Sequence, residues 1–409
     1  MRILVVAPMP PSPTAPGAIP RVLYAQLVGL EEHHDVAVAC VAGPEDHELE
    51  AVEHLRASGR RVEVARRREP QTAAERWRRR RRLAGGWLRG TMPWRSVWFR
   101  ESELEQLIAG LAREWQVELI AAEDSAVGIY DLPPGIPAVL TEYEVRRTRP
   151  FRLPPVGREW PQDVVRELDW QRWAGYQRAT WSRFELVQTF TRRDAASLTE
   201  LAPELAGRIR VVPFGLVVPP LPDRAEVPGS IAFVGNFTHA PNVDAALWLG
   251  REIMPKLRTQ TEGAALTIAG PVPPPAVRSL AAADIRIAGR VDDLPGLLAE
   301  TAVVVAPLRT GGGMRVKVVE ALAHGKAVVT TPRGAEGLAP DAPLEIGRDA
   351  GELAARIAAL LADAGARADL GRRAAEFAAA NHGPRAYAAR LERTYEEAVR
   401  RSAVRSAAR

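Results

Sequence analysis

The 409-residue sequence has few of the residues that form cross-links or metal sites. Its single cysteine, Cys40, lies in the strand-like stretch VAVACVA, which excludes disulfides and cysteine-ligated metals. The seven histidines lack the spacing of metal ligands, and no apolar run approaches the roughly eighteen residues of a membrane span. Because MRILVVAP leads directly into a strand pattern, we expect no signal peptide. These absences predict a cytoplasmic protein.

The first loop lacks the glycine motif of dinucleotide-binding proteins. Residues 3–7 and 36–41 have the pattern of strands, with a helix from about Arg21 between them, but residues 8–20 contain no GxGxxG. This loop is rich in proline, serine and glycine, and it is long enough to form one wall of an active-site cleft. We therefore predict that Gly17, whose backbone is free to adopt unusual angles, and Arg21 lie on the acceptor side of such a cleft.

Length and strand–helix alternation predict an α/β protein of two domains. A chain of this length is long for one hydrophobic core, and strand and helix patterns alternate in both halves. Between the halves lie five prolines, which favour a stiff linker: Pro213, Pro219, Pro220, Pro222 and Pro228. The predicted domains span residues 1–212 and 230–383, with the linker over residues 213–229.

Residues 301–331 contain the clearest candidate site. Val303–Ala306 and Ala327–Thr330 are short apolar runs typical of buried parallel strands, and apolar residues at helical spacing lie between them. Gly311, Gly312 and Gly313 therefore fall at the N-terminus of a helix. Unpaired backbone N–H groups and the helix dipole attract phosphate there.

Charged side chains on the same helix support an anion site. Arg315 and Lys317 add positive charge beside the glycines, and Glu320 is placed to accept hydrogen bonds from sugar hydroxyls. The alternative is an ordinary strand-to-helix turn whose Lys and Glu form an ion pair.

Positive charge is concentrated in residues 66–100. This stretch contains twelve arginines and two glutamates, a net charge of +10, whereas the whole chain carries +5. Four tryptophans lie among the arginines: Trp77, Trp87, Trp94 and Trp98. Interleaved arginine and tryptophan suit an anionic membrane surface, and a solvated helix whose tryptophans pack inward is the alternative. We expect no nucleic-acid partner, because no groove-reading motif accompanies the charge.

Two carboxylates follow predicted strands of the first domain. Residues 117–122 and 138–141 have strand patterns, and Glu123 and Glu142 come directly after them. Open parallel sheets bind their ligands at the carboxyl ends of the strands. Both glutamates are therefore candidates for binding acceptor hydroxyls, and capping of the following helix is the alternative for each.

The C-terminal half resembles the group 1 retaining glycosyltransferases of family 4, which have the GT-B fold. The resemblance rests on FVGN, PN, AG, GRVDD, APLRTGGGMRVKVVEALAHGKAVV and TPRGAEGL, and more loosely on MRILVVAP, TEYE, VQTFTRRDAASL and VVPFGL in the first half. It implies two Rossmann-like domains facing across a cleft. The second would bind a nucleotide-sugar donor, the first the acceptor, and a final helix over residues 384–401 would return to the first domain.

The resemblance implies roles for residues of the glycine turn. Glu320 stands at the second glutamate of the family's E-x7-E motif, which binds the donor ribose. Gly312 stands where many members have the first glutamate, so sugar recognition would pass to backbone amides of Gly312, Gly313 and Met314.

Two cations that many members use on the donor phosphates are missing here. Gly235 and Asn236 stand where many members have Gly–Arg, and Asn242 lies near the usual lysine. The resemblance implies that the charge comes instead from Arg315 and Lys317, with Arg309 nearby.

Three further residues are candidates for the donor site, two of them from the same comparison of motifs. Arg290 and Val291 fall where the family's backbone cradles the base, and His239 is a turn residue within reach of the donor. The neighbouring Asp292 is predicted to cap a helix rather than to bind a metal.

These assignments predict a glycosyltransferase. Breaking the bond between an anomeric carbon and a diphosphate builds negative charge on the leaving oxygens, which fixed positive groups stabilise. Arg315, Lys317 and the helix N-terminus are the predicted catalytic groups, with no obligatory metal or other cofactor. The resemblance implies retention of configuration, with a glycan, a lipid-linked sugar or a small molecule as acceptor.

Two alternatives remain open from the sequence. One is a sugar-nucleotide epimerase or hydrolase on the same fold, which would consume donor without acceptor. The other is a non-catalytic module that binds a membrane surface, such as the inner face of the cytoplasmic membrane, through residues 66–100.

Overall fold

The computed structural model describes residues 1–409 except 16, 68–71, 90, 91, 95, 97–99, 146–159, 314, 408 and 409. The chain divides into two compact units, one of Met1–Val212 with Tyr387–Arg409 and one of Pro213–Ala386. The proline-rich residues 213–229 thus belong to the second unit, and the chain returns to the first unit at Tyr387. Trp98 and Met314, both singled out by the sequence, lie outside the described residues.

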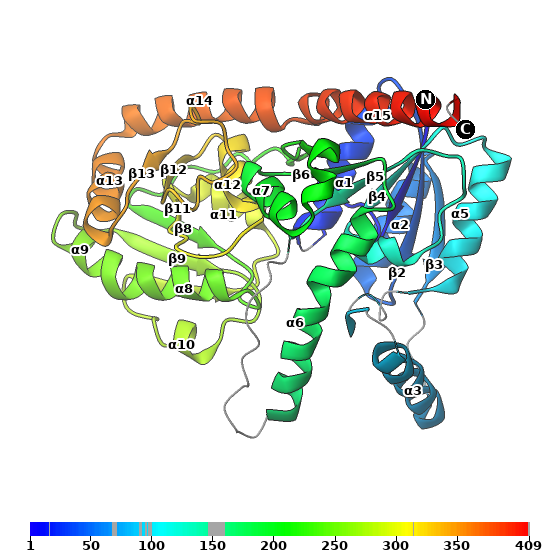
Figure 1. The fold of residues 1–409 in the computed structure, drawn as a ribbon. Helices are drawn as coiled ribbons and strands as arrows, with labels where there is room; N and C mark the ends of the chain where they lie inside the picture. Colours follow the sequence, from blue (N-terminus) through cyan, green and yellow to red (C-terminus); the bar gives the residue numbers. More distant parts are fainter. Residues whose placement is uncertain are drawn as a thin grey trace. The chain divides into compact units, whose positions relative to one another are not determined.

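The first unit is built on a seven-stranded parallel sheet in the order β3-β2-β1-β4-β5-β6-β7 (Figure 1). The central strands β1, β4 and β6 are buried on both faces, as expected for a sheet covered by helices on each side. Ile3 pairs with Val36 on one neighbour and with Leu119 on the other. Strand order therefore reverses between β1 and β4. The strands are β1 (Arg2–Ala7), β2 (Asp35–Ala42), β3 (Arg61–Arg66), β4 (Leu119–Glu123), β5 (Ala138–Glu142), β6 (Leu186–Thr189) and β7 (Ile209–Val211).

Helices of the first unit include one supplied by the C-terminal part of the chain. They are α1 (Ala18–Leu30), α2 (Asp46–Ala57), α3 (Ala73–Arg89), α5 (Ser102–Glu114), α6 (Trp160–Trp181), α7 (Arg192–Leu201) and α15 (Pro384–Ala407), with the 3-10 turns η1 (Ser125–Ile129) and η2 (Pro203–Arg208). Helix α15 is tied to the unit by a bond from Gln26 Nε2 to Tyr395 Oη of 3.0 Å and by an ion pair between Arg210 and Glu397.

The second unit has a six-stranded parallel sheet in the order β10-β9-β8-β11-β12-β13. Its strands are β8 (Ser230–Val234), β9 (Ala265–Ala269), β10 (Ile285–Gly289), β11 (Val303–Ala306), β12 (Ala327–Thr330) and β13 (Glu345–Ile346). Its helices are α8 (Ala240–Trp248), continued by the π turn η3 (Leu249–Ile253), then α9 (Met254–Arg258), α10 (Pro275–Arg278), α11 (Leu294–Glu300), α12 (Val316–Ala323), α13 (Ala350–Ala362) and α14 (Ala364–His382). Strand order reverses between β8 and β11, so ligands are expected at their carboxyl ends.

Two local differences from the sequence pattern come from aspartate caps. Residues 350–380 have the pattern of one helix, but Asp363 accepts a bond of 2.9 Å from Ala366 N and starts α14 there. Asp292 was predicted to cap a helix, and this is wrong: Asp293 caps α11 with a bond of 2.8 Å from Gly296 N. In both cases the short carboxylate satisfies an N–H group that the helix leaves unpaired.

Candidate active site

The triple glycine forms the turn between β11 and α12, as the sequence predicts. Gly311 and Gly313 have φ angles of 93° and 76°, which favour glycine. A Cβ atom on Gly311 would also lie 2.8 Å from Cγ of Pro241 in α8, so this turn packs closely on the start of that helix. Gly312 has open space around it, and its missing side chain therefore leaves room at the position of the family's first glutamate.

Lys317 extends from α12 to the end of β8. Its Nζ donates a bond of 2.5 Å to Asn242 Oδ1 and lies 4.8 Å from the ring centroid of Phe233. Asn242 Nδ2 in turn donates to Asn236 O at 2.7 Å, and a Cβ atom on Gly235 would be 3.1 Å from the ammonium. The structure thus places a cation beside the two positions where the sequence lacks the family's cations.

The environment of Lys317 makes its charge sensitive to a bound anion. Burial, together with the nearby positive charge of Arg315, lowers the pKa of Lys317 to about 7. A phosphate at this ammonium would favour the protonated form and raise that pKa again.

Arg315 has a different position from the one expected of a phosphate ligand. Its buried guanidinium donates to Gly312 O at 3.0 Å, Gly311 O at 3.2 Å and Arg333 O at 3.0 Å, and it pairs with Glu336 at 3.2 Å. These contacts hold the glycine turn in shape because they satisfy two of its carbonyl groups. In this structure Arg315 therefore positions the turn, and Lys317 is the cation beside Asn236 and Asn242.

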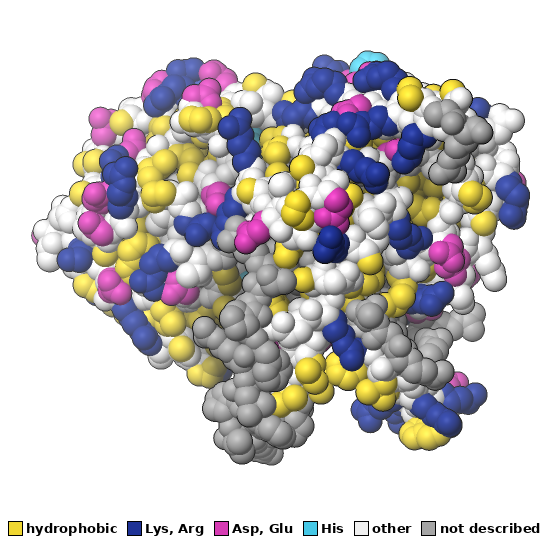
Figure 2. Space-filling view, viewed as in Figure 1, with side chains coloured by type: hydrophobic (Ala, Val, Ile, Leu, Met, Phe, Trp, Pro, Cys, Tyr) yellow, Lys and Arg dark blue, Asp and Glu magenta, His cyan; other side chains and the backbone are white. Residues whose placement is uncertain are grey.

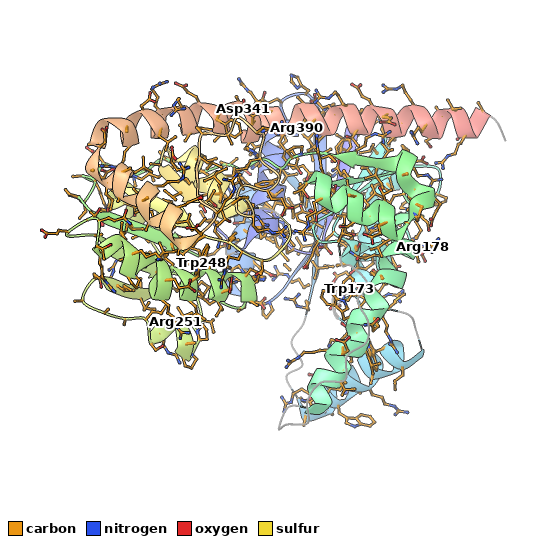
Figure 3. The ribbon with its side chains drawn as sticks, turned by 60° about the vertical axis from the view of Figure 1, so that its left-hand side comes forward. Trp173, Arg178, Trp248, Arg251, Asp341 and Arg390 are labelled. Carbon is orange, nitrogen blue, oxygen red and sulfur yellow. The ribbon has the colours of Figure 1, made fainter. Side chains whose placement is uncertain are left out.

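Arg309 is held against α8. Its guanidinium pairs with Asp244 at 2.5 Å and lies 4.8 Å from the ring centroid of Trp248, which Figure 3 labels. It lines a second cavity, of about 540 Å³, together with Trp248, Leu308, Thr331, Pro332, Arg333, Glu336 and Arg348. Arg309 is thus bound to other groups than those that surround Lys317.

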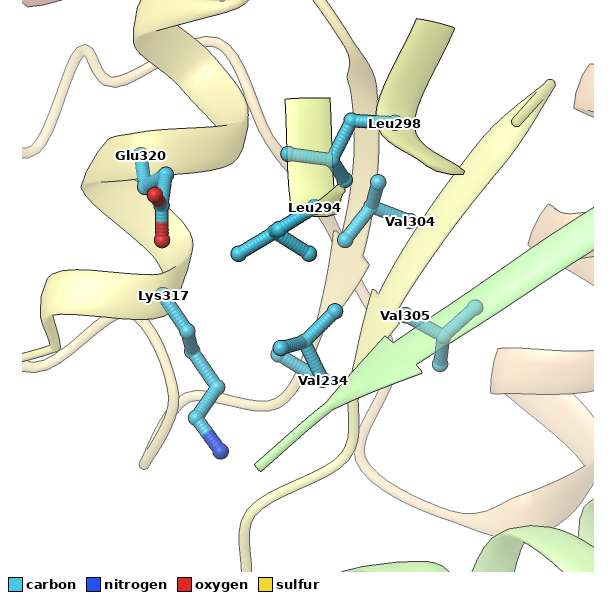
Figure 4. Close-up of a pocket in the computed structure, with 8 residues that line it drawn as sticks. Val234, Leu294, Leu298, Val304, Val305, Lys317 and Glu320 are labelled. Atoms are coloured by element: carbon cyan, nitrogen blue, oxygen red, sulfur yellow. The ribbon is translucent and has the colours of Figure 1, made fainter. Parts of the chain in front are cut away.

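Glu320 lies one turn beyond Lys317 on the same face of α12 (Figure 4). Its side chain is 9% exposed, and both residues line a small pocket of about 10 Å³ with Val234, Leu294, Leu298, Val304, Val305 and Ala306. Such a volume holds about one water molecule, so the pocket itself is too small for a sugar nucleotide. The role of ribose ligand stays a prediction.

Other predicted donor residues follow strands of the same sheet. Arg290 and Val291 come directly after β10, and Arg290 forms an exposed ion pair with Asp292 at 3.4 Å. His239 is exposed at the N-cap position of α8, in the loop after β8. Since all strands of this sheet are parallel, these loops share the edge at which Gly235 and the glycine turn lie.

Glu123 of the first unit is buried rather than available to an acceptor. Its carboxylate is 0% exposed and accepts bonds from Gln26 Nε2 at 2.8 Å and Tyr143 Oη at 3.1 Å. Burial raises the pKa of Glu123 to about 7. Gln26 also contacts Tyr395, so this glutamate belongs to the network that attaches α15.

Glu142 is buried in a similar way. It is 2% exposed, and it accepts bonds from Trp181 Nε1 at 2.7 Å and from the Ser125 hydroxyl. Burial, with the nearby charge of Asp124, raises the pKa of Glu142 to about 8. The expected contact of Glu123 and Glu142 with acceptor hydroxyls is thus corrected, because both carboxylates bind protein groups inside the unit.

The helix cap that was the alternative role for Glu123 is supplied by the next residue. Asp124, with a φ of 74°, accepts a bond of 2.8 Å from Ala126 N and starts η1.

Gly17, with a φ of 108°, precedes α1, and the partly buried Arg21 lies in the first turns of that helix. Gly17 lies in the loop after β1 and Glu123 is the last residue of β4, and the order of this sheet reverses between these two strands.

Part of the second unit matches a known protein family. Residues 228–363 match the family model described as "Glycosyl transferases group 1". This segment, about a third of the chain, is similar to a group 1 glycosyl transferase domain. It contains β8 to β12, the glycine turn and Lys317. No curated protein matches the chain in sequence.

Solved structures share the fold of the whole chain, including this segment. TarM of S. aureus has a TM-score of 0.64 at 8% identity, over 96% of this chain and 98% of that one. Sucrose-phosphate synthase of Thermosynechococcus elongatus has a TM-score of 0.62 at 15% identity, over 97% of this chain and 99% of that one. HepE of Anabaena, in complex with UDP and glucose, has a TM-score of 0.60 at 14% identity, over 96% of this chain and 98% of that one. The predicted GT-B fold is confirmed.

The described residues also contain neither metal-binding groups nor membrane-spanning helices. No group of three or more His, Cys, Asp or Glu side chains among them could hold a metal ion. None of their helices is long and apolar enough to cross a membrane.

Proposed function

We propose that the protein transfers a sugar from a nucleoside-diphosphate sugar to an acceptor hydroxyl, with retention of configuration and without an obligatory metal ion. The proposal starts from the similarity to group 1 glycosyl transferase domains and from the shared GT-B fold. HepE was solved with UDP and glucose, so UDP-glucose is the first donor to examine.

The position of Lys317 is the observation that carries the proposal. Its ammonium lies at the switch point of the sheet, beside Gly235, and Lys317 itself is the second residue of α12. A diphosphate bound there would meet both the ammonium and the unpaired N–H groups of the helix N-terminus. Both groups stabilise the charge that develops on the leaving oxygen as the glycosidic bond to phosphate breaks.

The proposed reaction balances without a metal ion or a covalent intermediate. The bond from the anomeric carbon to the β-phosphate oxygen breaks, and its electron pair leaves with the nucleoside diphosphate. The acceptor oxygen attacks from the same face, and its proton passes to a phosphate oxygen of the leaving group. Lys317 stabilises the leaving diphosphate, and Arg315 keeps the glycine turn in place through Gly311 and Gly312.

An assay of donor consumption tests this proposal. The purified full-length protein is incubated with UDP-glucose or other nucleoside-diphosphate sugars, with and without a panel of glycan, lipid-linked and small-molecule acceptors. We expect nucleoside diphosphate release that depends on acceptor, persists in EDTA and gives a product with the anomeric configuration of the donor. Rapid release without acceptor would support a hydrolase instead, and an inverted product would contradict retention.

Replacing the predicted ribose ligand should weaken donor binding. We expect Glu320→Gln to raise the donor KM about tenfold with a smaller change in kcat, because the amide loses a charged acceptor for sugar hydroxyls. Steady-state kinetics and calorimetric titration with the nucleoside diphosphate measure this. Glu262→Gln, an exposed position of the same unit, is the matched control. Equal donor affinity in both variants would remove Glu320 from the donor site.

A further inference from the structure

Helix α3 has a strongly basic composition and two exposed apolar side chains. Ala73–Arg89 contains seven arginines and one glutamate, a net charge of +6. Trp77 is 60% exposed and Leu88 70% exposed. These two residues are eleven positions apart, which is three turns, so both project from one side of the helix. Arg81 lies beside them, with its guanidinium 5.3 Å from the ring centroid of Trp77.

A neighbouring side of α3, about a quarter turn away, is attached to α6. Trp87 Nε1 donates a bond of 3.1 Å to Asp169, and the guanidinium of Arg172 lies 3.9 Å from the ring centroid of Trp87. Trp87 thus packs inward. The alternative hypothesis, a solvated helix, predicts this for every tryptophan of the stretch. Trp77 does not pack inward, and its exposure is not explained by packing within the unit.

Apolar exposure continues onto α6. Val165 is 43% exposed and Leu168 40% exposed, and their spacing puts them on the face of α6 that carries Asp169 and Arg172. Figure 1 shows α3 and α6 projecting from the first unit in the same direction. In Figure 2 apolar and basic side chains lie together at the end where α3 projects.

We propose that α3 lies in the plane of an anionic lipid bilayer. In this arrangement Trp77 and Leu88 enter the boundary between head groups and acyl chains, and the arginines bind lipid phosphates. Basic interfacial helices combine many arginines with exposed tryptophan and leucine in this way. Charge complementarity to anionic lipid is supplied by the net charge of +6, and the aliphatic Leu88, Val165 and Leu168 have no counterpart on a nucleic-acid backbone.

Vesicle binding by the full-length protein tests the proposal. We expect it to co-sediment with phosphatidylcholine vesicles that contain about 30 mol% phosphatidylglycerol, and much less with phosphatidylcholine alone. Replacing three exposed arginines, Arg78→Gln, Arg80→Gln and Arg81→Gln, should lower the partition coefficient roughly 100-fold. Trp77→Ser should lower it about tenfold without changing the preference for anionic lipid.

A charge-matched variant of the second unit is the control. Arg251→Gln, Arg278→Gln and Arg286→Gln remove the same charge from exposed positions there and should leave vesicle binding unchanged. Equal loss in both triple variants, or equal binding to both kinds of vesicle, would overturn the proposal. So would preferential binding of single-stranded nucleic acid that Trp77→Ser leaves intact. Transfer to a water-soluble acceptor should survive all these changes, so failure here is distinguishable from failure of the proposed function.

Discussion

Lys317→Ala should reduce kcat/KM for sugar transfer roughly 10² to 10³-fold, the usual cost of removing one electrostatic group that stabilises a leaving oxygen. The loss should fall mainly on kcat, because the charge on the diphosphate is largest when the bond to the sugar is breaking. Steady-state kinetics with varied donor separate the two parameters.

Two further variants make this result specific. Lys256→Ala removes an exposed lysine from α9 of the same unit and should have no effect. Asn242→Ala removes the carbonyl that orients the Lys317 ammonium and should cause a smaller loss than Lys317→Ala. The melting temperature of Lys317→Ala should stay near that of the parent, because no buried acidic group is left unpaired. An unchanged transfer rate would place the leaving group elsewhere.

Glu142→Gln should stabilise the protein at alkaline pH. The folded-state pKa of Glu142 is raised to about 8, above the ordinary value of 4.5, so its contribution to stability is present below pH 4.5 and is lost as the pH rises through 8. Glutamine imitates the protonated form and keeps an oxygen for Trp181 and Ser125. We therefore expect the variant to exceed the parent by roughly 3 kcal/mol in free energy of unfolding at pH 9, and to match it at pH 5.

Denaturant unfolding from pH 5 to 9 measures this difference. Glu123→Gln should show the same trend at lower pH, since its pKa is raised to about 7. Glu50→Gln, an exposed position on α2, should retain the pH dependence of the parent. A constant difference between Glu142→Gln and the parent across this range would mean that folding does not raise the pKa of Glu142.

Much of the fold follows from local patterns. The apolar runs at Val303–Ala306 and Ala327–Thr330 predict β11 and β12 with the observed bounds, because a strand covered on both faces must be apolar throughout. Sheet order and pairing register depend on contacts between distant segments, which periodicity does not encode. The split between α13 and α14 depends on one carboxylate, that of Asp363, and an alanine-rich pattern hides it.

The candidate site was predicted in outline but not in its contacts. Sequence spacing places Lys317 and Arg315 on the same helix start, yet only the structure shows that Lys317 reaches Asn242 while Arg315 binds Gly311 and Gly312. For Asn242, the sequence signal that places it near the donor site was the Pro–Asn pair at the start of α8.

Burial of Glu123 was also beyond local sequence. Its partner Gln26 is 97 residues away in the chain, and Tyr395, which is bonded to Gln26, is 369 residues from Gln26. Position at the end of a strand therefore predicts where such a carboxylate lies in the sheet, and not which groups surround it.

The attachment of α15 to the first unit affects the order in which the two units can complete their folding during synthesis. Residues 1–212 are synthesised first, but their unit also needs Tyr387–Arg409, which follows the whole second unit along the chain. The second unit is contiguous, from Pro213 to Ala386, and all of its sequence leaves the ribosome before the first unit has its last helix. The N-terminal unit is thus the second of the two to complete its fold, because Gln26, which binds Glu123, also needs Tyr395 as a partner.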